Sequence, residues 1–511
     1  MQSREARAQT KETILMPTST AFISAGQRHN HSHAQNRFAV IPTPQRLGAN
    51  AQYTGKGVAI AVLDSGFYPH PDLAQPENRI VAFKDVTDSG ASLKADAVPQ
   101  LWDWHGTQTS VVAAGNGYLS DGVYRGLASE AKLVLVKVSE RGRITDENIV
   151  RGLEWVIQNM RAYNIRVVSM SLGGDEDVSF RESIVDQAAE KAVQAGLAVV
   201  VAAGNTGCGA APRPIPPANS PSVITIGGYD DGNQLNNSEP DLYCSNFGPT
   251  VDGLVKPEII APAIWAPAPI LPGTDIYRRA EALSQLAAAP DYLLRDLIKQ
   301  LGEIAELPES IYQMSSAEIR LAVESLIVES KIISAHYQHV DGTSFAAPIV
   351  ASVVAQMLEA NPKLTPRVIK NILISTADRL THRPLARQGY GALNAGRAVE
   401  EAARERHTNH DDALTPPRVE NNRLVFCFHH DAAQTVALAG DFNGWNPARS
   451  IGAKQSDGIW RIEIEMLPPG SYQYKFVVNN HQWVDDPNNG LKLSDGHGGF
   501  NSALHIERQI I

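Results

Sequence analysis

The chain has 511 residues, which is more than one hydrophobic core usually fills, so we expect at least two domains. Hydrophobic residues make up 43% and charged residues 20%, a balance typical of globular proteins, and the net charge is −10. This acidic balance argues against nucleic-acid partners, which need basic surface, and no run of 18 or more apolar residues predicts a membrane span.

The first 45 residues form a polar tail that contains three histidines within HNHSHAQN, residues 29–36. We favour a disordered tail over a metal site there, because no second group of ligands accompanies the histidines. The N-terminus also lacks an apolar stretch of signal-peptide length. Together with only three cysteines, Cys208, Cys244 and Cys427, this favours a cytoplasmic protein in a reducing compartment.

From residue 55 onward, apolar stretches of strand length alternate with stretches of helical periodicity. GKGVAIAVLDSG and AKLVLVKV predict strands, whereas residues 145–164 open with a capping residue and carry apolar residues at helical spacing. A strand in 165–174, a helix in 179–196 that ends at Gly196, and the strands LAVVVAAGN and SVITIGG continue the pattern. Such alternation indicates an α/β domain whose parallel sheet has helices on both faces.

Residues 275–338 interrupt this alternation with two stretches of helical periodicity. The first predicts an apolar stripe on one helix face, formed by Leu294, Leu297, Ile298, Leu301 and Ile304. The second, AEIRLAVESLIVESK, repeats the pattern. We therefore expect a helical insertion, which either packs on its own domain or serves as a regulatory or docking element.

A polar segment with a Pro pair, within HTNHDDALTPPRVENN, predicts a linker at 405–420 between two domains, 46–404 and 421–511. Beyond the linker the hydrophobic period changes to two. Alternate apolar residues in WRIEIEM and YQYKFVV, with Pro-Gly, Asn-Gly and Asn-Asn turns nearby, predict a small all-β immunoglobulin-like sandwich.

Four polar residues lie in small-residue loops at the ends of predicted elements, in the order Asp64, His105, Asn205 and Ser344. Asp64 ends a strand, at the edge where α/β sheets collect functional residues. A serine hydroxyl becomes a strong nucleophile when a base takes its proton and a third group orients that base, and an asparagine amide can donate to a developing oxyanion. Each residue alone is more commonly a turn or capping residue, but the four together predict nucleophilic catalysis at Ser344.

The segments VLDSG, HGTQTSVVAAG, SMSLGG, VVVAAGN and DGTSFAAP resemble the successive signatures of the subtilisin-like serine proteases. The resemblance covers residues 46–404 outside the insertion. It implies a serine endopeptidase that acts on polypeptides, with Ser344 as nucleophile, His105 as general base and Asp64 orienting His105. It also implies an oxyanion hole formed by Asn205 and the Ser344 backbone N–H.

The same resemblance implies that two short segments bind the substrate backbone and wall the specificity pocket. They comprise Ser171, Leu172 and Gly173 of SLGG, and Ala202, Ala203 and Gly204 of AAG. The chain departs from the family pattern at Gln108, where a second histidine is usual, and at Phe345, where methionine is common. The 45-residue tail is too short for the folded prodomain of the secreted members, which favours an intracellular relative. No cofactor is required, and although calcium sites are common in the family, no calcium ligands can be matched here.

Three segments of the predicted sandwich, VALAGDFNGWNP, LPPGSYQYKFVVNNHQWVDDP and GGFNSALHI, resemble the glycogen-binding module of the AMP-activated kinase β subunit and of branching enzymes. This resemblance implies an α-glucan partner and a platform formed by Trp445, Lys475, Trp483 and Asn501. Strand alternation also leaves Lys475 on the face opposite the core, free to meet a ligand. Three alternatives stay open: the tryptophans pack the core, the module recognises protein, or the whole chain is a pseudoprotease scaffold.

Overall fold

The structure is a computed structural model that describes residues 40–506 except for short gaps, which lie at 89, 95–96, 175, 210–212, 236–238, 406–416, 431, 456–457, 490–491 and 498. The histidines of the tail and most of the predicted linker therefore lie outside the described residues. Ahead of residue 46, the described chain packs on the first domain. Val40 is buried, and the Arg46 guanidinium at the end of helix α1 (Thr43–Arg46) lies 2.9 Å from the Asp231 carboxylate.

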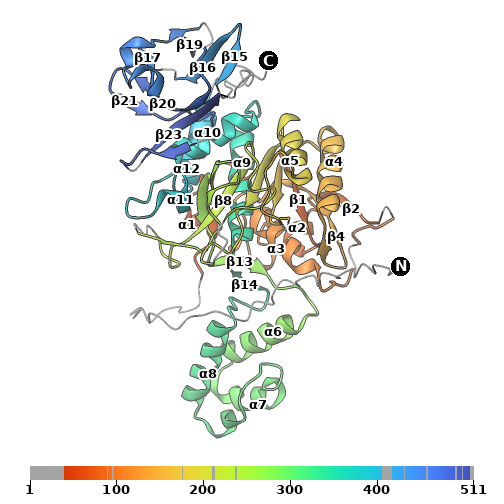
Figure 1. The fold of residues 1–511 in the computed structure, drawn as a ribbon. Coiled ribbons are helices and arrows are strands. Elements are labelled where there is room, and N and C mark those ends of the chain that lie inside the picture. Colours follow the sequence, from red (N-terminus) through yellow and green to blue (C-terminus); the bar gives the residue numbers. More distant parts are fainter. Residues whose placement is uncertain are drawn as a thin grey trace, which may run out of the picture. The chain divides into compact units, whose positions relative to one another are not determined.

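A parallel sheet forms the centre of the first domain. Its strands are β1 (Ala59–Asp64), β2 (Ile80–Asp85), β3 (Lys132–Lys137), β6 (Ile165–Met170), β7 (Ala198–Ala202), β8 (Ile224–Asp230) and β12 (Ile259–Pro262). They lie in the order β12-β8-β7-β6-β1-β3-β2, and β9 (Asp241–Leu242) pairs antiparallel with β8. Strands β8, β1 and β2 of this sheet are labelled in Figure 1. Near-continuous apolar strands such as AIAVLD fit a sheet that is covered on both faces.

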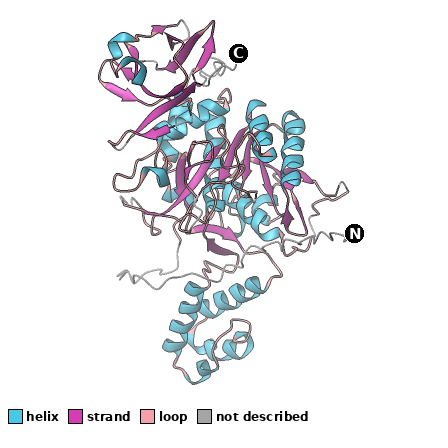
Figure 2. Cartoon of the chain, viewed as in Figure 1, coloured by secondary structure: helices cyan, strands magenta, loops and turns pink. Residues whose placement is uncertain are grey.

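Helices cover both faces of this sheet, as predicted (Figure 2). One face packs against α3 (Asp103–Ala114), α9 (Thr343–Ala360), α10 (Pro366–Thr376) and α12 (Ala395–Arg404). The other packs against α4 (Asp146–Tyr163) and α5 (Ile184–Gln194). Alternate residues of β1 serve the two faces, since Val62 joins the first core and Leu63 joins the second. The fold class predicted from the alternating pattern is confirmed.

Helix α9 carries Ser344 in its first turn. By length and composition it is apolar enough to cross a membrane, yet 83% of it is buried inside the domain. It is therefore a core helix, and its sequence, TSFAAPIVASVVAQMLEA, is apolar all round because it is enclosed on every side.

Short elements complete the first domain: α2 (Pro71–Ala74), η1 (Tyr118–Ser120), α11 (Leu385–Gln388) and the strand pairs β4 (Ser139–Glu140) with β5 (Arg143–Ile144) and β10 (Gly248–Pro249) with β11 (Val255–Lys256).

The insertion consists of α6 (Asp275–Ala288), α7 (Asp291–Leu301), η2 (Glu309–Gln313) and α8 (Ser316–Glu329), between the paired strands β13 (Ala266–Pro269) and β14 (Tyr337–Val340). The three α-helices contact one another, so the apolar stripes find partners within the insertion. Leu294 and Ile298 are buried as the predicted stripe requires. Ile304 is not part of that stripe, because α7 ends at Leu301 and the Ile304 side chain is exposed.

The C-terminal domain contains two antiparallel sheets, as the period-two pattern predicts. One has β15 (Arg418–Glu420), β16 (Arg423–His429), β18 (Ala453–Lys454) and β19 (Ile459–Glu465). The other has β17 (Val436–Gly440), β20 (Gly470–Val478), β21 (Gln482–Val484), β22 (Lys492–Ser494) and β23 (Phe500–Ile506). Phe426 and Trp460 of the first sheet share one core with Tyr474 and Phe476 of the second.

Candidate active site

Asp64 lies at the carboxyl end of β1 and is almost fully buried. A buried carboxylate is stable only when its oxygens accept hydrogen bonds, and this one has several donors. His105 Nδ1 lies 2.8 and 3.0 Å from the two carboxylate oxygens. The Ser65 backbone N–H and the Thr109 hydroxyl donate to them at 2.7 and 3.2 Å. The carboxylate thus fixes the imidazole through Nδ1 and leaves Nε2 on the opposite side of the ring.

His105 reaches Asp64 because α3 begins close to the end of β1. A Cβ on Gly106 would lie 2.2 Å from the Gly66 carbonyl oxygen and 2.8 Å from the Asp64 Cβ, so only glycine permits this approach. The departure at Gln108 has a structural reason, since its buried amide donates to the Pro269 carbonyl oxygen of β13 at 3.0 Å. Gln108 therefore joins α3 to the strand that precedes the insertion.

The pKa of His105 reflects two opposing effects. Burial lowers the pKa of the imidazole, whereas the negative charge of Asp64 and the hydrogen bond to it raise that pKa, and the net shift is upward from 6.5. The imidazolium that forms when His105 accepts a proton is thus favoured by its carboxylate partner.

Ser344 and Asn205 are brought together at the start of α9. Asn205 follows β7, and its Oδ1 accepts hydrogen bonds from the Thr343 N–H and hydroxyl, both at 2.9 Å. The Ser171 hydroxyl, just beyond β6, donates to the Ser344 carbonyl oxygen at 2.7 Å, and the Gly204 N–H donates to the Thr343 hydroxyl at 3.2 Å. Among the described residues, both side-chain hydrogen bonds of Asn205 use its oxygen, so its Nδ2 group is available there as a donor.

The remaining predicted segment residues lie at or just after the carboxyl ends of two neighbouring strands, β6 and β7, and Ala202 is the last residue of β7. Leu172, Ala202 and Ala203 are buried, and Ile215 and Pro216 are the nearest neighbours of Gly173. The hydrogen bonds of Ser171 and Gly204 to Ser344 and Thr343 join both segments to the turn that carries Ser344.

The Phe345 ring, at the start of α9, lies near the imidazole ring of His105. Its ring centroid lies 5.9 Å from that of His105, and its side chain is buried. The second departure from the family pattern thus puts an aromatic ring near the imidazole, with the two ring planes tilted by 51°. Among the described residues, no hydrogen bond joins the Ser344 hydroxyl to His105.

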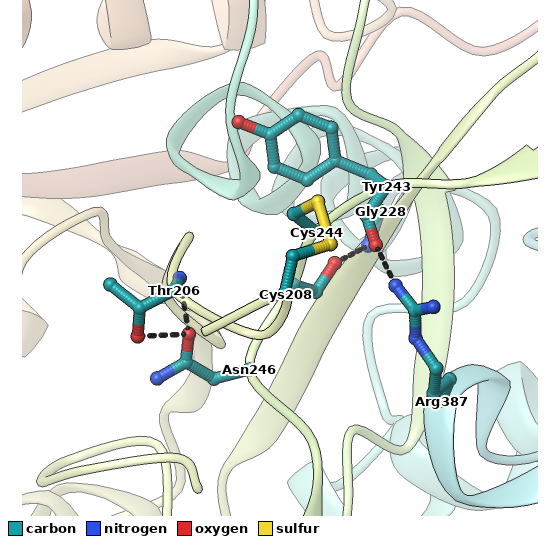
Figure 3. Close-up of a disulfide and its surroundings, with 8 residues drawn as sticks. Thr206, Cys208, Gly228, Tyr243, Cys244, Asn246 and Arg387 are labelled. Atoms are coloured by element: carbon teal, nitrogen blue, oxygen red, sulfur yellow. Dashed lines mark hydrogen bonds between the residues drawn. A yellow bond between two sulfur atoms is a disulfide. The ribbon is translucent and has the colours of Figure 1, made fainter. Parts of the chain in front are cut away.

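A disulfide near Asn205 was not predicted from the sequence. Cys208 and Cys244 are 36 positions apart and are bonded (Figure 3), with a Cα–Cα distance of 5.1 Å. Cys427 is free and buried. Sparse cysteines favour a reducing compartment, and the bonded pair departs from that expectation. Neither spacing nor composition indicates the pair, because it depends on how two loops meet in space.

Of the four residues predicted to bind glycan, Lys475, Trp483 and Asn501 lie in strands β20, β21 and β23 of the second sheet, and Trp445 lies in the connection after β17. The Trp445 and Trp483 rings have centroids 6.3 Å apart, and both lie outside the core cluster. The Trp445 indole N–H donates to Asp441 at 3.0 Å, and the Trp483 side chain is 45% exposed. The alternative that both tryptophans pack the core therefore does not hold.

Lys475 and Asn501 lie beside these tryptophans on neighbouring strands, and each already has a partner. The Lys475 ammonium lies 2.6 Å from the Asp495 carboxylate, and the Asn501 amide donates to Gln473 at 2.9 Å. The prediction that Lys475 leaves the core face is confirmed, but the lysine is ion-paired rather than free.

No calcium ligands can be assigned from the structure. Within the ranges that the structure describes, no three or more His, Cys, Asp or Glu side chains are grouped so as to hold a metal ion.

A buried Asp–His pair at the carboxyl end of a parallel strand, with a serine in the first turn of the adjacent core helix, is typical of serine hydrolases. Residues 55–391 match the model of the subtilase family, and the chain belongs to that family. Residues 422–511 match the model described as the glycogen recognition site of AMP-activated protein kinase. The chain thus combines a subtilisin-like serine endopeptidase domain with a glycogen-binding-like module.

Three known proteins illustrate the similarity. Serine protease AprX of Bacillus subtilis is 33% identical over 68% of this chain and 67% of its own length. The major intracellular serine protease of the same organism is 36% identical over 33% of this chain, which spans about half (49%) of that relative. A solved structure of a cold adapted subtilisin-like serine proteinase is 23% identical, with a TM-score of 0.40, and covers 68% of this chain and 89% of its own.

Proposed function

We propose that the chain hydrolyses peptide bonds through an acyl-enzyme, with Asp64, His105 and Ser344 as its catalytic triad. The observation that carries this proposal is the contact of His105 Nδ1 with the buried Asp64 carboxylate, beside the helix start that holds Ser344. His105 Nε2 takes the Ser344 proton as Oγ attacks the carbonyl carbon, and then gives it to the leaving amine. Water attacks the acyl-enzyme by the reverse proton transfers and releases the second product.

Asn205 Nδ2 and the Ser344 N–H are proposed to donate to the oxyanion of the tetrahedral intermediate. The positive N-terminal end of α9 favours the same negative charge. Residues 171–173 and 202–204 are proposed to hold the substrate backbone, because they border this turn from two adjacent strand ends. The direct test is hydrolysis of an internally quenched peptide by the purified chain; absence of any hydrolysis across varied peptide sequences contradicts the proposal.

Activity is expected to fall in acid with a midpoint above pH 6.5. His105 must be neutral to accept the Ser344 proton, and its pKa is raised by Asp64, so protonation removes the base at a higher pH than for an ordinary histidine. The measurement is kcat/KM from pH 5 to 9 with an uncharged peptide. In Asp64→Asn, the residual activity is expected to show a lower midpoint. A flat profile, or the same midpoint in both proteins, contradicts the role of the pair.

We also propose that the C-terminal module binds α-glucan and tethers the peptidase to it. Trp445 and Trp483 offer two aromatic faces at a separation that suits neighbouring sugar rings, while Lys475 and Asn501 offer polar groups. A shallow exposed platform that replaces well-solvated sugar hydroxyls gives modest affinity. Because a neutral glucan carries no charge to be screened, binding is expected to be largely insensitive to salt.

Trp445→Ala and Trp483→Ala are each expected to weaken retention of the chain on immobilised glycogen, since each removes one aromatic face. Hydrolysis of a small peptide and the melting temperature are expected to stay unchanged. Val419→Ala, at an exposed apolar residue of the other sheet, is the matched control and should bind like the wild type. If the folded wild-type protein binds neither glycogen nor maltoheptaose, the tether is contradicted. That result favours recognition of protein by the module.

A further inference from the structure

The loop that carries Asn205 lies side by side with a segment that is distant in sequence. One is the oxyanion loop, residues 204–208, which carries Asn205 after β7. The other, residues 244–246, is called the clamp segment here. The Cys208–Cys244 disulfide joins the two (Figure 3). The Gly207 N–H also joins them, because it donates to the Cys244 carbonyl oxygen at 2.9 Å.

Asn246 of the clamp segment holds the residues on both sides of Asn205. Its side-chain oxygen accepts hydrogen bonds from the Thr206 N–H at 2.7 Å and the Thr206 hydroxyl at 3.0 Å (Figure 3). Its backbone N–H donates to the Gly204 carbonyl oxygen at 3.0 Å. Its side-chain amide donates to the Arg213 carbonyl oxygen at 2.9 Å, and the residue is only 5% exposed. Every polar atom of this amide is therefore used within the protein.

The two segments approach too closely for side chains to separate them. A Cβ on Gly207 would lie 1.7 Å from the Ser245 carbonyl oxygen, so glycine is required at this position. The contact leaves little freedom for the backbone of the oxyanion loop. Within the described part of the chain, the side-chain hydrogen bonds of Asn205 are those from Thr343.

We propose that Asn246 is a positioning residue for Asn205: it fixes the backbone that aims the Asn205 amide at the oxyanion, without touching the substrate. This inference rests on the proposed function of Asn205. An oxyanion donor is effective only within a few tenths of an ångström of its hydrogen-bonding position, and a displacement of about 1 Å can cost about 10²-fold in rate. Such a loss falls on kcat, because the oxyanion exists only in the transition state and intermediate.

The test is a double-mutant cycle on kcat and KM with Asn205→Ala, Asn246→Ala and both together. Asn205→Ala is expected to lower kcat about 10²–10³-fold. Asn246→Ala is expected to lower kcat about 10–100-fold with KM within about threefold of wild type. Because Asn246 acts through Asn205, the double variant is expected to match Asn205→Ala within about threefold. Unchanged kcat in folded Asn246→Ala, a loss confined to KM, or losses that multiply in the double variant would each overturn the inference.

Asn361→Ala is the matched control, because its amide also donates to backbone carbonyls, those of Ala402 and Glu405, but at the far end of α9. It should leave kcat unchanged. If Asn246→Ala does not fold, the test uses the double variant Cys208→Ser, Cys244→Ser, which loosens the same two segments. This variant is expected to lower kcat in the wild-type background. It is expected to cause no further loss of kcat in the Asn205→Ala background. Wild-type protein without peptidase activity, or full activity in Asn205→Ala, instead marks failure of the proposed function.

Discussion

Replacing Ser344 with alanine is expected to lower kcat by about 10⁴-fold or more, while KM and the melting temperature change little. The hydroxyl is the atom that forms the acyl-enzyme, and no other group can take its place. The carbonyl oxygen of residue 344, which accepts the Ser171 hydrogen bond, is retained by alanine, so the turn keeps its structure. The measurement is hydrolysis of an internally quenched peptide under single-turnover and steady-state conditions.

Ser352→Ala is the matched control for this variant. Ser352 lies on the same helix, is buried, and donates its hydroxyl to the Ile349 carbonyl oxygen within that helix. It should retain kcat and KM, because its hydroxyl does not face the site. Peptidase activity in Ser344→Ala equal to that of Ser352→Ala would remove Ser344 from the mechanism.

Replacing Asp64 with asparagine is expected to lower kcat by about 10⁴-fold with little change in fold. The amide has the size of the carboxylate but presents an N–H to His105 Nδ1. The imidazole then carries its proton on Nε2, and that nitrogen can no longer accept the proton of Ser344. The rate is measured near the pH optimum, with denaturation followed in parallel to show that the variant is folded.

Asp85→Asn controls for the loss of a buried carboxylate at a strand end. Asp85 ends β2, is buried, and its carboxylate lies 2.6 Å from the Lys137 ammonium. This variant is expected to be less stable, because it leaves the partly buried Lys137 charge without its carboxylate partner, but to keep its kcat. Equal losses of activity in Asp64→Asn and Asp85→Asn would mean that Asp64 has only a structural role.

The elements that sequence predicts well are those whose pattern is local. The strand AIAVLD and the helix at 145–164 carry continuous or periodic apolar residues, and both are present as β1 and α4. Strand β14, YQHV, was missed because its residues are mostly polar and it exists only by pairing with β13, across the whole insertion. The predicted stripe ran on to Ile304 because its spacing is helical, but the chain leaves the helix after Leu301.

The residues of the candidate site also differ in how well the sequence predicts them. Four residues each belong to a short motif at the end of a helix or strand, so the sequence predicts that they form one site: Asp64, His105, Asn205 and Ser344. Asn246 belongs to no such motif, and its role is visible only where the loops of two strands meet. In the C-terminal module, the alternation of apolar and polar residues along the strand predicts which face Lys475 lies on. It does not predict the ion pair of Lys475 with Asp495, because Asp495 lies in a loop.

The measurement that tests the central claim most directly is the site of covalent labelling by a serine-reactive fluorophosphonate, located by mass spectrometry of the digested protein. The reagent mimics the tetrahedral intermediate, so it needs a nucleophile, a base and an oxyanion hole at one place. We expect one adduct, on Ser344, that forms at the rate at which peptidase activity is lost, disappears in Ser344→Ala and forms far more slowly in Asp64→Asn. An adduct on another residue, or an unlabelled Ser344 in protein that still hydrolyses peptide, would contradict the account.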